Sequence, residues 1–545
     1  MDLQSTLKNL IQDAILKAFD LTVETVLFEL PKDPTHGDLS TPVAFSLSKP
    51  LKQAPKSIAE AIVSHLAATD FIEEVTVAGP GFLNFRFKKA TQTDVINHIL
   101  EDFQAFSETK AGLGQKILLE FVSVNPTGLM HIGHARGAAS GDTLARILRK
   151  NGFEVLTEYY VNDAGNQMDK LAESLFARYQ EAAGHSVDFP DDGYHGEDIK
   201  ALALKLYQDH GDQYLENKGA LAFFKQAGLD ALLQEIKDDL ATSRVHFDSF
   251  YHESSLYQSG AIDDVLSRLK ASGYTYELDE ALYLKTTAFG DEKDRVLIKS
   301  NKDYTYILPD IAYHEQKIKR GYPHLIDILG TDHHGYVARL KASLEILGYQ
   351  DVLEVLLLQI VRVLDNGEEI KMSKRSGKAL ALKDLIEDIG VDPVRYFFAA
   401  RSLNTHMDLD LELARKQKND NPVFYLQYAY ARIQSLFEKA SHLNHAFDPD
   451  VKTYHTLENP LINDLLNHLR NYPDTLKKAA LSRDIHKVPK YLHDLAGLFH
   501  KWYSAESFLT GEKDYITERL SVLKAIEKVL EDGFELIGIE AKKVM

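Results

Sequence analysis

The sequence predicts an α/β fold, in which a doubly wound parallel sheet lies between a small α/β segment and an all-helical C-terminal bundle. Residues 117–124 form an apolar run typical of a buried strand, 133–150 show helical periodicity ending at Asn151-Gly152, and 153–161 resume a strand pattern. These segments make one β-α-β unit, the building block of a parallel sheet. After about residue 420 the periodicity is helical throughout.

The N-terminal segment has its own pattern of short elements. A helix, a strand, a second helix and two further strands are expected at 1–19, 23–29, 55–68, 72–77 and 82–87. Gly79-Pro80-Gly81 supplies the turn between the last two strands. The pattern indicates a small α/β domain.

The sheet pattern is interrupted after the first β-α-β unit. Residues 166–273 are mostly helical, and strands are expected again at 282–287, 295–299, 325–330 and near 358–364. We therefore expect three domains: a small α/β domain over 1–110, a sheet-based domain over 111–400 with a mostly helical insertion at about 166–290, and a helical domain over 401–545.

Composition is that of an ordinary globular protein. A chain of 545 residues is too long for one core, and 44% hydrophobic with 26% charged residues is typical of globular domains. No run approaches the ~20 apolar residues of a membrane span. Residues 1–19 lack the basic-then-apolar layout of a signal peptide. These features predict a cytoplasmic protein without a membrane partner.

The chain has no cysteine, which excludes disulfides and every cysteine-ligated zinc or iron–sulfur site. No His-x-x-x-His pair lies on a convincing helix, so no protein-held metal is expected. The net charge of −19 alone argues against a nucleic-acid partner. However, residues 421–545 hold 16 Lys and Arg against 17 Asp and Glu, a net −1, which leaves −18 for the remainder. The last segment is therefore the part best suited to meet a polyanion.

The most informative stretch follows the first predicted strand. It reads Val124-Asn125-Pro126-Thr127-Gly128-Leu129-Met130 and then His131-Ile132-Gly133-His134 at the start of the helix. A helix N-terminus offers unpaired N–H groups and the positive end of its dipole, to which two imidazoles add further donors. Because ligands bind at the carboxyl ends of parallel strands, this stretch predicts a phosphate or nucleotide site.

A second motif lies far downstream. Lys371-Met372-Ser373-Lys374-Arg375, followed by Ser376-Gly377-Lys378, is a short basic loop that on its own is typical of a solvated turn. Together the two motifs resemble the signatures of class I aminoacyl-tRNA synthetases, and specifically those of the arginyl-tRNA synthetase family. Arg375 departs from the usual loop, which ends in serine.

The resemblance extends over nearly the whole chain. Further segments similar to the arginyl family are His36-Gly37-Asp38, 79–84, 160–167, 290–297, 310–314, 330–335 and 421–429. It implies a Rossmann-type catalytic domain, an N-terminal domain that touches the outer corner of tRNA, and a C-terminal anticodon-binding bundle. It also implies a monomer that uses ATP with Mg²⁺ and no zinc, that activates L-arginine, and that charges tRNA(Arg). Activation itself is expected to require tRNA.

The resemblance also implies roles for the motif residues. His131 and His134 would stabilise charge at the α-phosphate, and Lys371 and Lys374 would reach the β- and γ-phosphates. The expected ATP-binding residues are Asn125, Pro126, Thr127, His131, Gly133, His134, Gly330, Asp332, His333, Lys371, Met372, Ser373 and Lys374.

A guanidinium has five N–H donors in one plane and is best met by carboxylates and amide oxygens. By resemblance, the expected arginine-binding residues are Glu120, Ser123, Asn125, Tyr306, Asp310 and His334, with Asp310 as the guanidinium partner. Two alternatives stay open: Glu120 forms only a local ion pair, and Tyr306 only packs.

In the helical segment, the expected tRNA contacts are Tyr425, Gln427, Tyr428 and Arg432, and the alternative is an aromatic stripe that belongs to the core. Trp502 is expected in the core.

Three other functions compete with the arginyl one. A glutamyl or class I lysyl synthetase shares both motifs, but Glu120 with Asp310 favours a cationic substrate. An inactive relative that only binds RNA would not need both histidines and both lysines. A small nucleotidyltransferase would need neither the second lysine loop nor a helical tail of about 120 residues.

Overall fold

The structure is a computed structural model that describes residues 3–29, 31, 36–216, 219–331, 334–370, 380–457 and 459–545, with the side chains of 3–5, 89–91 and 334 left out. It forms two compact units. The first comprises Met1–Phe106, Ile433–Tyr472 and Gly497–Val529, and the second comprises Ser107–Arg432, Pro473–Ala496 and Leu530–Met545. Helices from the last third of the chain therefore contribute to both units.

The first unit contains an antiparallel sheet of three strands in the order β1-β3-β2, covered by helices. Its elements are α1 (Leu3–Phe19), β1 (Leu39–Thr41), α2 (Val43–Leu51), α3 (Pro55–His65), β2 (Ile72–Ala78), β3 (Phe82–Phe87) and α4 (Lys89–Glu101). Apolar residues three and four apart on α1, such as Leu7 and Ile11, pack against Phe85 of β3 in one core.

The strand expected at 23–29 is wrong. Only Glu29 forms a bridge, with Ser40, and the carbonyl groups of Val23 and Glu24 accept hydrogen bonds from the Gln12 side chain. The Gln12 side chain, on α1, thus provides hydrogen bonds to these carbonyl groups that a neighbouring strand would otherwise provide.

In the same unit, α4 is hydrogen-bonded to the segment around Lys452 and Tyr454. The Asn97 amide donates to the carbonyl of Lys452 (2.9 Å), and the Tyr454 hydroxyl donates to Asn97 Oδ1 (2.9 Å). α4 also packs against α18 (Pro460–Arg470).

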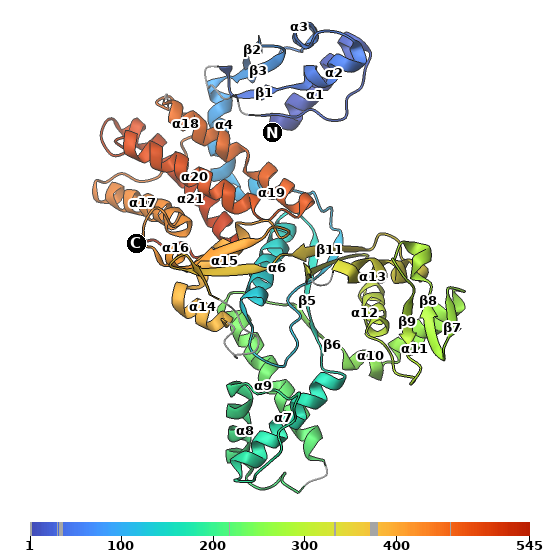
Figure 1. Ribbon diagram of the computed structural model, residues 1–545. Coiled ribbons are helices and arrows are strands. Elements are labelled where there is room, and N and C mark those ends of the chain that lie inside the picture. The colour runs from blue at the N-terminus through green and yellow to red at the C-terminus, as the bar shows by residue number, and fades with distance from the viewer. Residues whose placement is uncertain are drawn as a thin grey trace. The chain divides into compact units, whose positions relative to one another are not determined.

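The second unit is built on a parallel sheet of five strands in the order β11-β10-β4-β5-β6 (Figure 1). The strands are β4 (Lys116–Glu120), β5 (Glu154–Val161), β6 (Ser249–His252), β10 (His324–Gly330) and β11 (Leu353–Leu358). The expected β-α-β unit is present, with α6 (Ile132–Lys150) joining β4 to β5. The doubly wound α/β architecture is confirmed.

The first strand is shorter than expected. It ends at Glu120 rather than at 124, because Val122 and Ser123 have positive φ angles of 69° and 42°, which turn the chain out of the extended conformation. Ser123 and Asn125 therefore lie in the loop after the strand, and only Glu120 lies on it.

The insertion between β5 and β6 is helical, as expected. It consists of α7 (Asn166–Ala182), α8 (Glu197–His210) and α9 (Ala220–Thr242), with α7 packed against the other two (Figure 1). β6 then returns to the sheet as a strand that the periodicity did not reveal, because four residues are too few to show an alternation.

A small antiparallel sheet and a helix follow before the main sheet resumes. The elements are α10 (Ser254–Gln258), α11 (Ala261–Ala271), β7 (Thr275–Leu278), β8 (Ala281–Leu284), η2 (Thr286–Phe289), β9 (Arg295–Ile298) and α12 (Ile307–Lys319). Buried residues of α12, including Ile307, Leu308 and Ile311, join one core with Leu325 of β10.

The single strand expected near 358–364 is two strands. β11 ends at Leu358, and β12 (Val361–Asp365) leaves the main sheet to pair with β13 (Glu368–Glu369) and β14 (Met407–Asp410). The break between β11 and β12 occurs where the Gln359 N–H donates to the carbonyl of Leu403, outside the main sheet.

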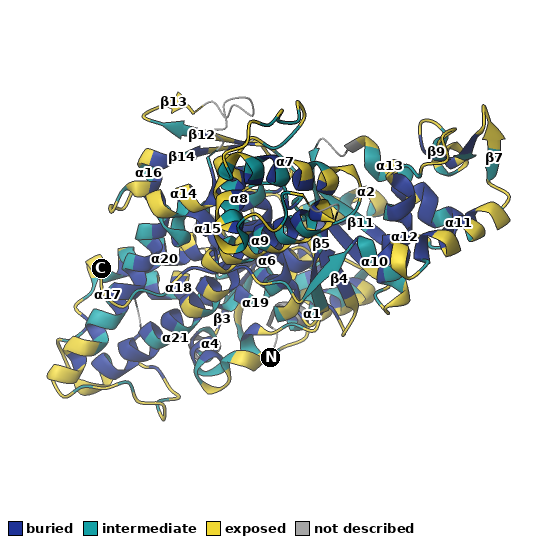
Figure 2. Cartoon of the chain, turned by 90° about the horizontal axis from the view of Figure 1, so that it is seen from below, coloured by how far each residue is buried: buried dark blue, intermediate teal, exposed yellow. Residues whose placement is uncertain are grey.

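The remaining helices confirm the helical character of the last segment. They are α5 (Phe103–Ser107), α13 (His334–Ile346), α14 (Leu382–Ile389), α15 (Val391–Ala399), α16 (Leu411–Arg415), α17 (Pro422–His442), α19 (Tyr472–Ser482), α20 (Lys487–Ala505) and α21 (Lys513–Ile537). Figure 2 shows buried and exposed faces along these helices, and Trp502 is fully buried, as expected. In the part of the chain that is described, no helix is long and apolar enough to cross a membrane.

Candidate active site

The candidate site lies at the carboxyl ends of the parallel strands. Glu120 is the last residue of β4, Asn162 and Asp163 follow β5, and Glu253 directly follows β6. Asp310 lies in the first turn of α12. In open parallel sheets this edge is where ligands bind.

The first motif forms the N-terminus of α6. His131 is the N-cap, and the Gly133 N–H donates to His131 Nδ1 (3.1 Å) while the His131 N–H donates to His134 Nδ1 (3.2 Å). The two rings stack with their centroids 3.5 Å apart. Because both Nδ1 atoms accept, each neutral imidazole carries its proton on Nε2 and presents that atom as a donor.

Gly133 is required by this capping arrangement. A Cβ at position 133 would lie 3.0 Å from Cε1 of His131 and 3.2 Å from its Nδ1. These contacts are tighter than most Cβ contacts in proteins, so any other residue would force the imidazole of His131 to shift from its place over the helix start.

The whole second motif lies outside the described residues, including Lys371, Met372, Ser373 and Lys374. Asp332 and His333 also lie outside them, as does the side chain of His334. The residues just after the second motif are described, and their backbone is hydrogen-bonded to the backbone of the first motif. Leu382 N–H donates to the carbonyl of Met130 (2.8 Å), and Ile132 N–H donates to that of Leu380 (3.3 Å).

A buried ion-pair cluster surrounds Glu120. Lys317 is fully buried, and its Nζ donates to Glu120 Oε2 (2.6 Å) and to Asp327 Oδ1 (3.0 Å). Ser123 Oγ donates to the other Glu120 oxygen (2.9 Å). Both carboxylate oxygens of Glu120 thus have partners, as the ion-pair alternative for this residue expected.

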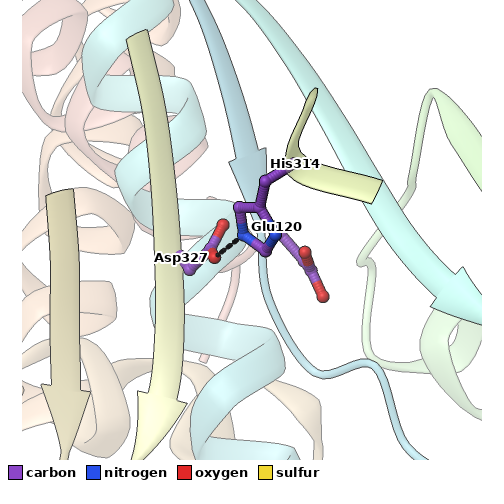
Figure 3. A group of neighbouring side chains, drawn as sticks. All are labelled: Glu120, His314 and Asp327. Atoms are coloured by element: carbon purple, nitrogen blue, oxygen red, sulfur yellow. Dashed lines mark hydrogen bonds and ion pairs between the residues drawn. The ribbon is translucent and has the colours of Figure 1, made fainter. Parts of the chain in front are cut away.

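His314 belongs to the same cluster. Its Nδ1 lies 2.8 Å from the carbonyl oxygen of Asp310, and its Nε2 lies 2.7 Å from Asp327 Oδ2 (Figure 3). Asp327, with Lys317 and His314 beside it, has a pKa well below its ordinary value even though burial opposes this.

Glu120, His314 and Asp327 bring one ligand atom each within 4.8 Å of one another, a spacing that suits a metal ion (Figure 3). The ammonium of Lys317 contacts both carboxylates, however, and supplies the positive charge that a metal would bring. The donor set therefore fits a cluster neutralised by the chain itself better than a metal site.

Asp310 is a carboxylate of this region that accepts a hydrogen bond from a neutral group. The Tyr336 hydroxyl donates to Asp310 Oδ2. Burial raises the pKa of Asp310 to about 6, although the tyrosine hydroxyl and His314 favour its charged form. Tyr306, expected to act with Asp310, is 81% exposed at the start of α12, so the alternative that it only packs does not describe it.

Sequence reasoning missed Glu253. Its side chain is buried, at 8% exposure, and the Asn162 amide, oriented with its nitrogen toward acceptors, donates to Glu253 Oε2 (3.0 Å). Burial, followed by repulsion from Asp310, raises the pKa of Glu253 to about 7. The signal available in the sequence was a glutamate after a strand, but the strand itself was not recognised.

The expected ATP residues that are described lie around the two motifs. Pro126 is buried in the loop after β4, where the Thr127 N–H donates to the carbonyl of Asn125 (2.7 Å). Gly330 ends β10, the neighbour of β4 in the sheet. The described positions thus converge on one edge of the sheet.

The residues expected to contact tRNA divide into two groups on α17. Gln427 is 2% exposed, and its amide nitrogen donates to Asp392 Oδ2 (2.8 Å) and to the carbonyl of Glu540 (2.9 Å). It lines a cavity of about 500 Å³, and neither Glu120 nor Asp310 is among the residues that line this cavity. This internal placement does not fit a tRNA contact, because both amide protons are already used.

The partly exposed residues of α17 form a stack. The rings of Phe424 and Tyr428 lie 5.7 Å apart at 23°, and the guanidinium of Arg432 lies 4.2 Å above the Tyr428 ring. Tyr425 lies on another face, with its ring 5.2 Å from that of His493. The stack runs along one side of the helix at intervals of four residues.

Comparison with known families covers nearly all of the chain. Residues 5–87 match the arginyl tRNA synthetase N terminal domain, 95–392 match the catalytic domain of tRNA synthetases class I (R), and 426–545 match the DALR anticodon binding domain. The catalytic match alone spans more than half of the chain and contains the first motif, Glu253 and Asp310.

Individual relatives agree with these matches. The chain is 47% identical to an arginine–tRNA ligase of Geobacillus kaustophilus over 95% of this chain and 94% of the relative, and 45% identical to one of Bacillus subtilis over 100% and 99%. The structure of a putative arginyl-tRNA synthetase from Campylobacter jejuni is similar at a TM-score of 0.78 and 35% identity, covering 84% of this chain and 100% of that one. The chain belongs to the arginyl-tRNA synthetase family of class I aminoacyl-tRNA synthetases.

Proposed function

We propose that the chain activates L-arginine with ATP and transfers the arginyl group to the 3′ end of tRNA(Arg). Its relatives are named arginine–tRNA ligases, and the three family matches supply a catalytic domain and an anticodon-binding domain. The observation that carries the proposal is the excess of carboxylates at the sheet edge beside the histidine-capped N-terminus of α6. An anionic site for a cationic substrate there adjoins donors for a phosphate.

In the activation step, the arginine carboxylate attacks the α-phosphorus of ATP. A C–O–P bond forms to give arginyl-adenylate, the bond from the α-phosphorus to the bridging oxygen breaks, and pyrophosphate leaves. His131 and His134 donate from Nε2 to the α-phosphate oxygens as charge develops on them. Mg²⁺ that arrives with the nucleotide neutralises charge on its phosphates. Lys371 and Lys374 follow the family pattern and act on the β- and γ-phosphates.

The arginine side chain binds at Asp310. Lys317 forms an ion pair with Glu120 and so fixes its position. Asp310 accepts a hydrogen bond from the neutral Tyr336 hydroxyl, so its negative charge is left for the substrate. Ser123, Asn125 and Tyr306 complete the site by the family pattern. In the second step, the terminal ribose hydroxyl of tRNA attacks the acyl carbon and AMP leaves.

Anticodon recognition belongs to α17. Tyr428 and Arg432 present an aromatic face and a guanidinium plane, the groups on which single-stranded bases stack. Tyr425 is a further candidate from the same helix. The charging reaction takes place in the cytoplasm, and the enzyme acts as a monomer.

The test is a charging assay with each of the twenty amino acids, with and without tRNA. Arginine should be the only amino acid attached, and ATP–pyrophosphate exchange should require tRNA. A His134→Ala variant should activate arginine about 100-fold more slowly, because it loses a donor to the transition state. Equal charging with lysine or glutamate would contradict the proposal.

A further inference from the structure

The transfer step releases a proton from the ribose hydroxyl of tRNA as that hydroxyl attacks the acyl carbon. A side chain placed to accept such a proton speeds the reaction by about 10²–10⁴-fold. His131 and His134 are placed as donors instead, because their Nδ1 atoms accept backbone hydrogen bonds and their protons are on Nε2. The same edge of the sheet carries another histidine with the opposite arrangement.

His252 and Asp163 form a hydrogen-bonded pair at the carboxyl edge of the main sheet. His252 is the last residue of β6, and Asp163 follows β5, the strand beside it. His252 Nδ1 lies 2.9 Å from Asp163 Oδ2. Since a carboxylate only accepts, the neutral ring carries its proton on Nδ1 and its lone pair on Nε2. A histidine oriented in this way by a carboxylate has the geometry of a general base.

Asp163 is itself held in place, whereas the ring of His252 is accessible. The Asp163 side chain is 7% exposed, and its two oxygens accept from the Ser254 N–H (2.8 Å) and the Ser254 hydroxyl (2.8 Å). The hydroxyl of Ser254 donates to the carboxylate, so it is not placed as a nucleophile for His252 to activate. The His252 side chain is 42% exposed, which leaves it within reach of a substrate.

The sheet register places this pair beyond the level of Glu120. Glu120 of β4 lies beside Glu158 of β5, and His252 lies beside Val161, three residues farther along β5. At ~3.3 Å per residue, His252 is about 10 Å past Glu120 along the strands and two strands across. With the guanidinium of arginine held at Asp310, the acyl end lies away from that carboxylate. A base beyond Glu120 is therefore placed for the acyl end and for the ribose that attacks it.

We propose that His252 is the general base of the transfer step and that Asp163 positions it. This inference rests on the proposed function of arginyl transfer to tRNA. The ribose O–H bond breaks as its proton moves to Nε2, and the ribose oxygen forms a bond to the acyl carbon. The bond from the acyl carbon to the phosphate oxygen breaks, and AMP leaves with the electron pair. The resulting imidazolium is paired with Asp163 and passes its proton to solvent.

The experiment measures activation and transfer separately in the full chain. ATP–pyrophosphate exchange with arginine and tRNA reports activation, and rapid-quench single-turnover charging reports transfer. His252→Asn keeps an N–H donor near the position of Nδ1, so the bond to Asp163 survives while the lone pair of Nε2 is lost. Transfer should slow by about 100-fold, exchange should stay normal, and arginyl-adenylate should accumulate.

Chemical rescue distinguishes a base from a structural residue. In His252→Ala, the space left by the partly exposed ring is open to imidazole added to the buffer, which should restore transfer in proportion to its concentration. His246→Asn is the matched control, because His246 is exposed and lies three residues before β6, at the other end of the strand. This control should transfer at the normal rate and show no response to imidazole.

The inference is overturned by normal transfer in His252→Asn protein that melts normally. It is also overturned if exchange slows as much as transfer, since His252 would then act in activation. Slow transfer in His252→Ala that imidazole does not restore would limit His252 to a structural role. The proposed function fails separately, if the unmodified protein shows no exchange with arginine and attaches none to tRNA.

Discussion

At the residue scale, the chain bears an energetic cost for burying two carboxylates at the edge of the main sheet. Asp310 and Glu253 have pKa values raised to about 6 and about 7, so each is easier to bury neutral than charged. The unfolded chain ionises both acids near pH 4. The contribution of these two acids to the stability of the ligand-free protein therefore falls as pH rises from about 4 to about 7 and stays low above that range.

Asp310→Asn should separate stability from function. The amide cannot ionise, so the variant escapes a penalty of about 3 kcal/mol at pH 8, less the weakened contact with the Tyr336 hydroxyl. Its melting temperature without ligand should equal or exceed that of the unmodified protein at pH 8, and this advantage should be smaller at pH 5 and disappear below about pH 4. Arginine affinity should drop by about tenfold or more, while ATP affinity holds.

Melting curves across pH 5 to 8, with calorimetric titration of arginine and ATP, check this prediction. A variant that melts lower at pH 8 than at pH 5 relative to the unmodified protein would show that Asp310 is charged without penalty. An arginine affinity within twofold of normal would make Glu120 the main guanidinium partner instead.

Sequence reasoning succeeded with residues whose chemistry is local. The helix start that carries His131 and His134 depends on a few neighbouring positions, so the sequence pattern predicts it, whereas the mutual capping of the two histidines was not predicted. Lys317 and Glu253 could not be found in this way, because Glu120, a partner of Lys317, and Asn162, a partner of Glu253, lie far from them in the sequence. For Gln427 the prediction of an RNA contact was wrong. Its amide lies in a run of aromatic residues in the sequence, but in the structure it donates to the carbonyl of Glu540.

At the scale of elements, strong periodicity predicted the right structure and weak periodicity did not. The β4-α6-β5 unit has a buried strand and a helix of nineteen residues, and its pattern was recognised. β6 was missed because it has four residues. A strand was wrongly expected at 23–29, where the Gln12 side chain donates a hydrogen bond to the backbone instead of a neighbouring strand. In both cases hydrogen bonds between distant parts of the chain determine the structure, and a local sequence pattern does not show them.

The exposed stack on α17 makes a prediction for this helix. Tyr428→Ala and Arg432→Ala should each reduce discrimination between cognate and anticodon-altered tRNA by ~1–3 kcal/mol, the worth of one stacking contact. Adenylate formation with saturating cognate tRNA should stay normal. Gln427→Ala, on the buried face of the same helix, should instead lower the melting temperature without changing discrimination.

Charging rates with matched tRNA transcripts, together with melting curves, distinguish these effects. If Tyr428→Ala unfolds the protein, the stack belongs to the core and the anticodon contacts lie elsewhere. If both variants fold and discriminate normally, the role assigned to this face of α17 is wrong.

At the scale of the molecule, one buried arginine joins the first motif to the segments around the small sheet of β12. Arg136 on α6 is fully buried and donates to the carbonyls of Gln359 (2.7 Å), Ser402 (2.9 Å) and Thr405 (3.0 Å). Burial lowers its pKa to about 10, which still leaves it charged at neutral pH. Its three acceptors come from two separate loops of the second unit.

Arg136→Lys should loosen this connection, because an ammonium cannot reach three carbonyls that a planar guanidinium spans. We expect a stability loss of about 2 kcal/mol and an adenylation rate about tenfold lower, with arginine affinity within twofold of normal. Arg149→Lys is the control, since Arg149 lies on the same helix but is 41% exposed. Single-turnover adenylation and urea unfolding measure the two quantities. A stability loss with an unchanged rate would limit Arg136 to a structural role.

The backbone pairing of 130–132 with 380–382 has a further consequence for the second motif. Lys371 directly follows Ile370, whose N–H is bonded to the carbonyl of Val363, and Lys374 lies six positions before Leu380, which is bonded to Ile132. Leu380, the first described residue after the second motif, is thus bonded directly to the helix start that carries His131. Two motifs that lie far apart in the sequence therefore meet at one backbone junction, and a change in the path of either segment there displaces the other.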